Sequence, residues 1–352
     1  MILTLLSFLV ILMVLILAHE LGHFVTAKIF GVTVEEFGLG FPPRLVSFEK
    51  GGTRYSLNII PLGGFVKLAG EEDPNISNSL ASKSIGTRLL VLSAGSIMNL
   101  ILPLLLFSTA FMIPHDVLIG DVVIGEVDPD SPAAGANITA GDIILSINEK
   151  TINNTIDLHR YIQLNLGKEM NILVKHIDST TDDVKVIPRW KPPEGRGAVG
   201  IVVTTANPAV VRQSEPFWKA IPSGITECID TFILFKNGII GMIIGSAPVE
   251  IAGPVGIAQI TGEVVKAGIS PLLEFAAFLS INLGIINLFP LPALDGGRII
   301  FVLLEGIRRG KRISPRAEGL VHAIGFALLM AAFLAITYQD IARIISGDSL
   351  IP

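Results

Sequence analysis

Long stretches of this chain carry no charged side chain, and this feature constrains the fold more than any other. Residues 1–18, 89–113 and 275–294 contain no Asp, Glu, Lys or Arg, and residues 319–339 contain one histidine and no charged side chain. A helix needs about 20 residues to cross a hydrocarbon core of about 30 Å. With 50% hydrophobic and 16% charged residues overall, the sequence predicts a polytopic α-helical membrane protein with four transmembrane helices.

The same composition argues against several other classes of protein. The single cysteine, Cys228, cannot form an internal disulfide, and a net charge of −5 offers no basic surface for nucleic acid. The first apolar stretch has neither a basic segment before it nor a small-residue cleavage site after it, so we expect a retained helix rather than a signal peptide. Residues 229–245 are apolar but contain Lys236, Asn237 and three glycines. They predict a helix at the membrane interface, with a fifth span as the alternative.

Lys and Arg residues gather in two connections between the predicted spans, at residues 44–88 and 298–316. Short connections of this kind stay on the cytoplasmic side of a membrane. We therefore expect a multi-pass protein of the inner (plasma) membrane with an extracytoplasmic insert. The predicted parts are a first membrane half over residues 1–113, an inserted domain over 114–205, a linker with an amphipathic helix over 206–270, and a second membrane half over 271–352.

The insert has the pattern of a small α+β domain. Val122–Val127 is typical of a strand, and Asp128–Gly135 of a turn that enters a short helix. This order resembles a PDZ domain of the circularly permuted bacterial kind. The resemblance implies that Val199-Gly200-Ile201, after a glycine-rich turn, holds an extended peptide that adds as a strand. A small β domain that only shields the membrane opening is the alternative.

His19-Glu20-Leu21-Gly22-His23, at the end of the first span, is the motif that indicates chemistry. Residues four apart lie on one helical face, so His19 and His23 can share a metal ion, with Glu20 beside them in reach of a water molecule. Zinc suits two histidines and one oxygen ligand. Such a string also occurs by chance in soluble helices. Its position favours function, because ionisable side chains at the end of an apolar span are expensive to place in lipid.

Asp295 is the strongest candidate for the third ligand. It is the first carboxylate after the charge-free run of 20 residues that ends at Leu294, and the predicted orientation places it on the same side as His19 and His23. An aspartate before Gly-Gly that only caps a helix is the alternative.

Taken together, these motifs resemble the site-2 protease family of intramembrane zinc metalloproteases, in particular the bacterial sigma-factor-regulating group that carries a PDZ insert. The resemblance rests on the histidine motif, on the Asn-x-x-Pro-x-Pro-x-Leu-Asp-Gly-Gly element that ends at Gly297, on the insert, and on Tyr55–Gly70. It covers nearly the whole chain. The chain departs from the best-known members in having room for one PDZ domain rather than two.

The resemblance implies one catalytic Zn²⁺ held by His19, His23 and Asp295, with Glu20 as the general base that activates water for hydrolysis of peptide bonds in transmembrane segments. It also implies substrate-binding roles. Asn287 is expected to hold the substrate backbone, with help from Asn282, although Asn282 and Asn99 could equally serve helix packing.

The segment Tyr55–Leu68 predicts a β-hairpin, with strands over Leu57–Ile60 and Phe65–Leu68 and a turn over residues 61–64. By resemblance, this hairpin lies in the membrane beside the metal and pairs with unwound substrate through Gly63, Gly64, Phe65 and Val66. An ordinary cytoplasmic hairpin is the alternative, but its edge would be left unprotected.

The resemblance further implies the partners. Substrates are expected to be single-span membrane proteins already shortened by another protease, such as anti-sigma factors, and remnant signal peptides. Two other functions compete with this interpretation. A non-catalytic membrane adaptor with a PDZ domain would need no base between the histidines, and a zinc transporter would need polar groups at several depths of the membrane.

Overall fold

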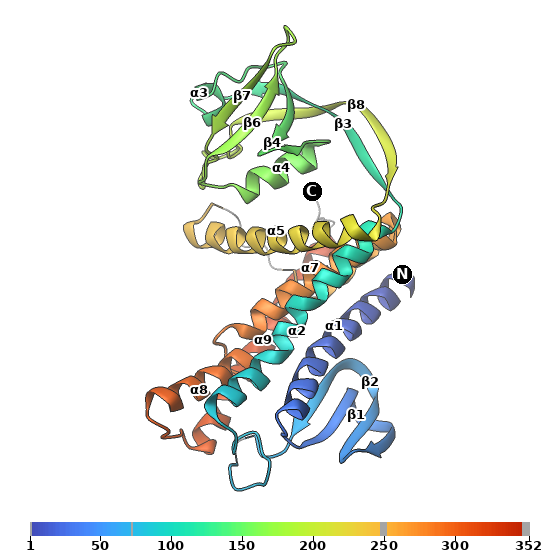
Figure 1. Ribbon diagram of the computed structural model, residues 1–352, viewed down its shortest axis with the longest axis vertical. Coiled ribbons are helices and arrows are strands. Elements are labelled where there is room, and N and C mark those ends of the chain that lie inside the picture. Colours follow the sequence, from blue (N-terminus) through green and yellow to red (C-terminus); the bar gives the residue numbers. More distant parts are fainter. Residues whose placement is uncertain (1, 72, 247–251, 347–352) are drawn as a thin grey trace. The chain divides into compact units, whose positions relative to one another are not determined.

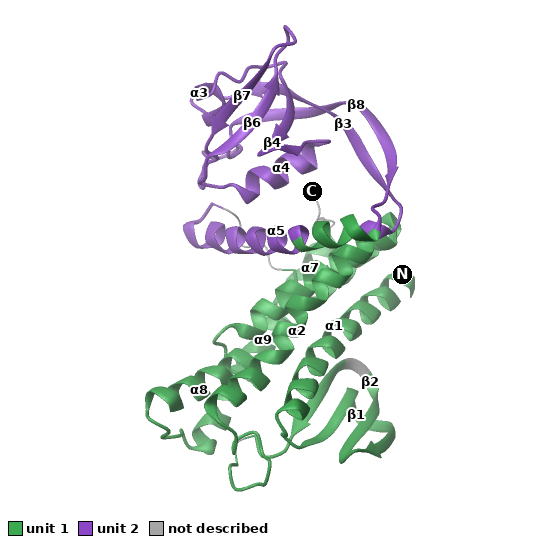
Figure 2. Ribbon diagram, in the orientation of Figure 1, with its two compact units in different colours: residues 1–110, 217–225, 251–352 green, residues 111–216, 226–250 purple. Residues whose placement is uncertain are grey.

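The computed structural model describes residues 2–71, 73–246 and 252–346, and the chain divides into two compact units. Unit 1 comprises Met1–Ala110, Phe217–Ile225 and Ile251–Pro352, and unit 2 comprises Phe111–Pro216 and Thr226–Glu250 (Figure 2). One helix, α5 (Phe217–Ile244), contributes to both units.

Four helices of unit 1 are long and apolar enough to cross a membrane: α1 (Ile2–Ile29), α2 (Ile85–Met112), α7 (Ile269–Leu288) and α9 (Pro315–Ser346) (Figure 1). The predicted number of spans is confirmed. The third ends at Leu288 rather than at residue 294, because Phe289 has extended backbone angles and the prolines that follow cannot continue a helix. Among the residues described, α5 is not a candidate span, so the fifth-span alternative is not supported.

The spans approach each other closely where small and polar residues meet. A Cβ atom on Gly22 of α1 would overlap the carbonyl oxygen of Ala94 in α2. Ser280 Oγ of α7 donates a hydrogen bond of 2.8 Å to the carbonyl oxygen of Asn99 in α2. Helices in lipid associate through close backbone approach and interhelical hydrogen bonds of this kind. As a result, α2 contacts both α1 and α7.

Two shorter helices complete the helical part of unit 1. Helix α6 (Pro254–Ala267) packs on α1, where a Cβ atom on Gly262 would lie 2.6 Å from Thr4 Cγ2. The buried Asp340 of α9 accepts a hydrogen bond of 2.8 Å from the backbone N–H of Gly256 in the first turn of α6. Helix α8 (Asp295–Ile307) follows the loop after α7.

Two long strands, β1 (Val34–Lys50) and β2 (Thr53–Leu68), form a sheet beside α1. Residues 36–39 of β1 pair with residues 54–57 of β2 and also with residues 64–67, while residues 46–50 pair with residues 53–57. The two strands therefore double back into four short segments. Residues 64–67 lie at one edge of this sheet and residues 46–50 at the other.

The predicted hairpin within Tyr55–Leu68 is wrong in its pairing. Leu57–Ile60 and Phe65–Leu68 both pair with β1 rather than with each other, and the tight turn lies at Gly51-Gly52. These two glycines have φ values of 59° and 71°, the left-handed values that a two-residue hairpin turn requires. Residues 61–64 continue β2, and Gly63, with φ of 94°, permits a bend within that strand.

Unit 2 is built on an antiparallel sheet with strand order β7-β6-β4-β3-β8, and β5 pairs with β4. The strands are β3 (His115–Val127), β4 (Ile143–Ile147), β5 (Lys150–Thr151), β6 (Met170–Lys175), β7 (Thr181–Val186) and β8 (Ile201–Gln213). Helices α3 (Pro132–Gly135) and α4 (Thr155–Leu164) lie between strands in the chain. The predicted strand and short helix of residues 122–135 are present, but the strand begins at His115 because it extends along β8.

The core of unit 2 predicts a clear stability difference between two isoleucines. Ile172 of β6 is fully buried, so we expect Ile172→Ala to destabilise unit 2 by about 2–5 kcal/mol through lost burial and the cavity left behind. Ile177, with 76% of its surface exposed, is the matched control, and Ile177→Ala should change stability by less than about 0.5 kcal/mol. Limited proteolysis of the full-length protein in detergent under increasing urea measures both. Equal effects would contradict this core assignment.

Candidate metal centre

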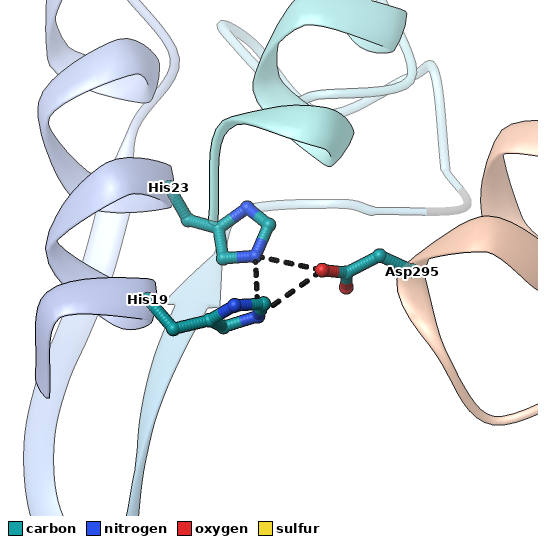
Figure 3. A group of neighbouring side chains, drawn as sticks. All are labelled: His19, His23 and Asp295. Carbon is teal, nitrogen blue, oxygen red and sulfur yellow. Dashed lines mark hydrogen bonds and ion pairs between the residues drawn. The ribbon is translucent and has the colours of Figure 1, made fainter. Parts of the chain in front are cut away.

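Three side chains from distant parts of unit 1 meet at one point (Figure 3). His19 and His23 extend from adjacent turns of α1, and Asp295 extends from the first residue of α8. Asp295 Oδ2 lies 3.1 Å from the Nε2 atom of each histidine, and the two Nε2 atoms lie 3.2 Å apart. Within the described part of the chain, this is the only group of three or more His, Cys, Asp or Glu placed to share a metal ion.

The spacing of these atoms fits a zinc ion. In a tetrahedral site with bonds of about 2.0–2.1 Å, ligand atoms lie about 3.3 Å apart, close to the three observed distances. His23 Nδ1 lies 2.8 Å from the carbonyl oxygen of Val91, so this nitrogen donates its proton to the backbone and leaves Nε2 as the free lone pair. Metal-binding histidines are typically oriented by such an outer hydrogen bond. Both histidines are buried, with 8% of their surfaces exposed.

A glycine makes room for the two imidazoles. A Cβ atom on Gly95 of α2 would overlap His23 Nε2 and would lie 2.8 Å from His19 Cε1. Any larger residue at this position would displace the ring nitrogens from the cluster. The sequence alone does not reveal this role, because only the packing of α2 on α1 brings Gly95 to the histidines.

The loop between α7 and α8 places Asp295. Leu294 has an extended backbone at the N-cap of α8, no side chain caps that helix, and the Asp295 carboxylate faces the histidines instead. The capping alternative for Asp295 is therefore wrong. Added Cβ atoms on Gly296 and Gly297 would overlap the carbonyl oxygens of Phe289 and Leu291, which explains the Gly-Gly pair after the aspartate.

Electrostatics favour the charged form of this carboxylate. Burial acts to raise the pKa of Asp295, but the close contacts of its carboxylate with the His19 and His23 imidazoles outweigh burial and hold the pKa below its ordinary value. Helix α8 is itself anchored, since Glu305 Oε2 lies 2.6 Å from Arg88 Nη1 of α2 in a pair whose side chains are about one-tenth exposed. Because separation would leave Arg88 buried without this partner, the pair resists movement of α8 away from α2.

Glu20 lies between the histidines and the sheet. A Cβ atom on Gly64 of β2 would lie 3.3 Å from Glu20 Cγ, and the Glu20 carboxylate interacts with the backbone of Val66. The edge segment of the sheet, residues 64–67, therefore runs past the side chain next to His19. The structure thus brings Gly64 and Val66 to the metal centre, and Phe65 lies in the same segment with its ring against Gly38.

The two predicted substrate asparagines are not part of this cluster. Asn282 donates its side-chain hydrogen bond to the carbonyl oxygen of Phe278, one turn earlier in α7, at 2.9 Å. Asn287 is partly exposed in the last turn of α7. Asn99 is fully buried, and its side-chain oxygen and nitrogen have no hydrogen-bond partner among the described residues.

Gly95 generates a prediction about metal binding. In Gly95→Ala, the added methyl group would push both imidazoles out of position, so we expect zinc affinity to fall by about 10–100-fold, the range seen when the support of ligands is lost. Gly86→Ala, on the same helix where an added Cβ meets nothing within 4 Å, is the control and should bind zinc normally. Zinc content after dialysis against a competing chelator measures both. Unchanged affinity in Gly95→Ala would contradict the geometry described here.

Comparison with known proteins identifies the family of this chain. Residues 7–332 match the model of peptidase family M50. A Clostridium acetobutylicum protein whose name contains the words zinc metalloprotease is 35% identical, covering 93% of this chain and 94% of its own length. Zinc metalloprotease RasP of Oceanobacillus iheyensis is 30% identical, with 97% and 99% covered, and the regulator of sigma-W protease RasP of Bacillus subtilis is 29% identical, with 97% and 99% covered.

A solved structure resembles part of the chain. The PDZ domain of an SdrC-like protein from Listeria innocua is 24% identical and covers 25% of this chain and 97% of its own, with a TM-score of 0.22, too low to support an argument about fold. The family match and the relatives extend over both membrane halves and the metal centre. The chain belongs to peptidase family M50, the site-2 protease family, and is a multi-pass membrane zinc metalloprotease.

Proposed function

We propose that this metalloprotease hydrolyses peptide bonds within the transmembrane segments of single-span membrane proteins, using one zinc ion held by His19, His23 and Asp295. The observation that carries the proposal is the position of the cluster. Its two histidines are buried near the end of α1, an apolar helix long enough to cross a membrane, beside a sheet with a free edge. A protease with this arrangement is suited to a substrate that arrives in the plane of the membrane.

Glu20 performs the proton transfers in this proposal. The zinc ion, when bound, supplies Lewis-acid activation of the attacking water and of the scissile carbonyl. The Glu20 carboxylate accepts a proton from the water and then donates it to the leaving amide nitrogen. The interaction of Glu20 with the Val66 backbone keeps this carboxylate between α1 and β2, where a substrate strand would lie.

The edge of the β1–β2 sheet supplies a binding site for unwound substrate. A transmembrane helix hides its carbonyl groups in internal hydrogen bonds, so it must be extended before it can be cut. Residues 64–67 pair with β1 on one side only, so their other side offers backbone groups for strand addition. Gly63, Gly64, Phe65 and Val66 are the substrate-binding residues in this proposal, and Asn287 with Asn282 contacts the substrate backbone from α7.

The orientation proposed for the protein follows from its basic connections. The β1–β2 sheet and the region after α8 are rich in Lys and Arg, which favours the cytoplasmic side of the inner membrane for them and for the metal centre. Unit 2, inserted after α2, is then extracytoplasmic. Helix α5 fits the membrane interface, because a stripe of exposed apolar side chains runs at helical spacing from Trp218 to Phe232. The stripe consists of Trp218, Ile221, Ile225, Ile229 and Phe232.

Unit 2 is proposed to be a PDZ-like domain that receives an extended peptide. Val199, Gly200 and Ile201 line a cavity of about 490 Å³, together with Leu158 and Ile162 of α4. Gly200 has φ of 78° and would place a Cβ atom against Ser131, so the loop depends on glycine there. A hollow between a helix and the start of a strand suits strand addition better than a domain that only shields the membrane.

Substrates are proposed to be anti-sigma-like single-span proteins already shortened by another protease, and remnant signal peptides. The B. subtilis relative is named for its part in regulating sigma-W. A substrate that has lost its outer domain would reach the metal centre past unit 2, whereas an intact one would be excluded by its size.

The role of Glu20 gives the central test. In Glu20→Gln the metal ligands are intact but the proton acceptor is lost, so cleavage of a tagged, pre-shortened single-span substrate should fall by about 10²–10⁴-fold with zinc content unchanged. Glu169→Gln, at an exposed position of unit 2, is the control and should cleave normally. If wild-type protein retains no zinc and cuts none of several such substrates, the proposal fails and a peptide-binding adaptor becomes the better interpretation.

The sheet edge makes a separate prediction about where the substrate lies. In an inactive Glu20→Gln, Cys228→Ser background, a cysteine at Val66 should form a disulfide with a cysteine in the substrate's transmembrane segment. A cysteine at Val46, which lies in the segment at the opposite edge of the sheet, should not. Cross-linking from Val46 alone, or equally from both positions, would contradict strand addition at residues 64–67.

A further inference from the structure

A histidine in the last span contacts the loop that precedes Asp295. His322 of α9 accepts, through Nδ1, a hydrogen bond of 3.0 Å from the backbone N–H of Ala293. The His322 ring also lies 5.5 Å, centroid to centroid, from the ring of Phe301 in α8. His322 therefore touches both the end of the loop and the helix that Asp295 begins.

Ala293 has a backbone conformation that needs support. Its φ is 75°, in the left-handed region that residues with a Cβ atom rarely adopt. A conformation of this kind persists only where the surrounding structure holds it in place. Ala293 lies two residues before Asp295, so its backbone angles set the direction in which α8 starts.

Gly325, one turn further along α9, also contacts this loop. A Cβ atom on Gly325 would overlap the side chain of Pro292 and would lie 3.0 Å from the Pro292 carbonyl carbon. Residues three apart lie on one helical face, so His322 and Gly325 hold consecutive loop residues from one side.

This contact is distinctive because most of α9 is exposed. Gly325 and Asp340 are its only buried residues in the described part of the chain, and Asp340 serves the start of α6. The face of α9 that carries His322 and Gly325 is thus the part of this span that packs on the metal-bearing loop.

We propose that His322 is a positioning residue for the third metal ligand. By accepting the Ala293 hydrogen bond, it holds the left-handed turn that directs the Asp295 carboxylate toward His19 and His23. The proposal rests on the ligand role of Asp295 proposed above. It requires a hydrogen-bond acceptor at the position of Nδ1, and therefore an imidazole that carries its proton on Nε2.

The test compares His322→Leu with His322→Asn in the full-length protein in detergent. Asn places its side-chain oxygen at the level of Nδ1 and can accept the same hydrogen bond, whereas Leu cannot. The readout is zinc affinity, measured as bound zinc against a competing chelator. We expect His322→Leu to bind zinc about 10–100-fold more weakly, and His322→Asn to bind close to wild type. Leu334→Ala, at an exposed position of α9, is the control and should leave affinity unchanged.

A second variant tests the turn itself. Glycine adopts a φ of 75° without strain, so Ala293→Gly in the His322→Leu background should recover zinc affinity. If the double variant binds as weakly as His322→Leu, or if His322→Leu binds like wild type, the positioning role is overturned. Should His322→Leu not fold, His322→Gln, whose acceptor lies beyond the Nδ1 position, replaces it as the loss variant.

Asp295→Ala separates this inference from the function on which it rests. If Asp295→Ala keeps full zinc affinity, the proposed ligand set fails and takes the role of His322 with it. If Asp295→Ala loses zinc while His322→Leu does not, the ligand set stands and only the positioning role is rejected.

Discussion

The rest of the structure depends on one constraint: three ionisable side chains must be brought together at the end of an apolar helix. Two imidazoles and a carboxylate are expensive in such surroundings unless they hold an ion or each other. The two histidine Nε2 atoms and Asp295 Oδ2 lie 3.1–3.2 Å apart, so each of the three groups has the other two as close polar neighbours. Such close approach leaves little freedom to the neighbouring elements. Residue 95 must be glycine, because any side chain there would overlap the rings. The start of α8 must also place the Asp295 carboxylate next to both histidines.

Several elements of unit 1 hold the Asp295 carboxylate in position. A short proline-rich loop connects the end of α7 to the start of α8. Within it, Ala293 has a left-handed conformation, and the two glycines after Asp295 lie against carbonyl oxygens of the loop. Helix α8 is tied to α2 by the Arg88–Glu305 pair, and the loop is held from α9 by His322. The cluster of His19, His23 and Asp295, which comes from α1 and α8, is therefore supported by α2 and α9 as well.

The β1–β2 sheet solves a different physical problem. A protease acting on membrane helices needs an extended partner for its substrate, yet an exposed strand edge invites pairing with other chains. Here the two strands double back so that one edge, residues 64–67, runs beside Glu20. The edge thus lies beside α1, where the proposed substrate strand would add. In unit 2, a cavity between α4 and the start of β8 is the proposed place for an extended peptide.

The sequence by itself determined the four spans, the histidine pair, Glu20, the third candidate ligand Asp295 and the order of elements in the insert. These features follow from charge-free length, from helical periodicity and from turn residues, all of which are local properties. Tertiary structure alone decided the pairing of β2 with β1. Residues 61–64 have the sequence of a turn, but in the structure the chain turns at Gly51-Gly52, and this sets which residues of the two strands pair. It also decided the need for glycine at residue 95, the left-handed turn at Ala293 and its contact with His322. Each of these features either joins residues tens of positions apart or holds a residue with a Cβ atom in a left-handed backbone conformation. A linear pattern of residue types carries no record of such contacts.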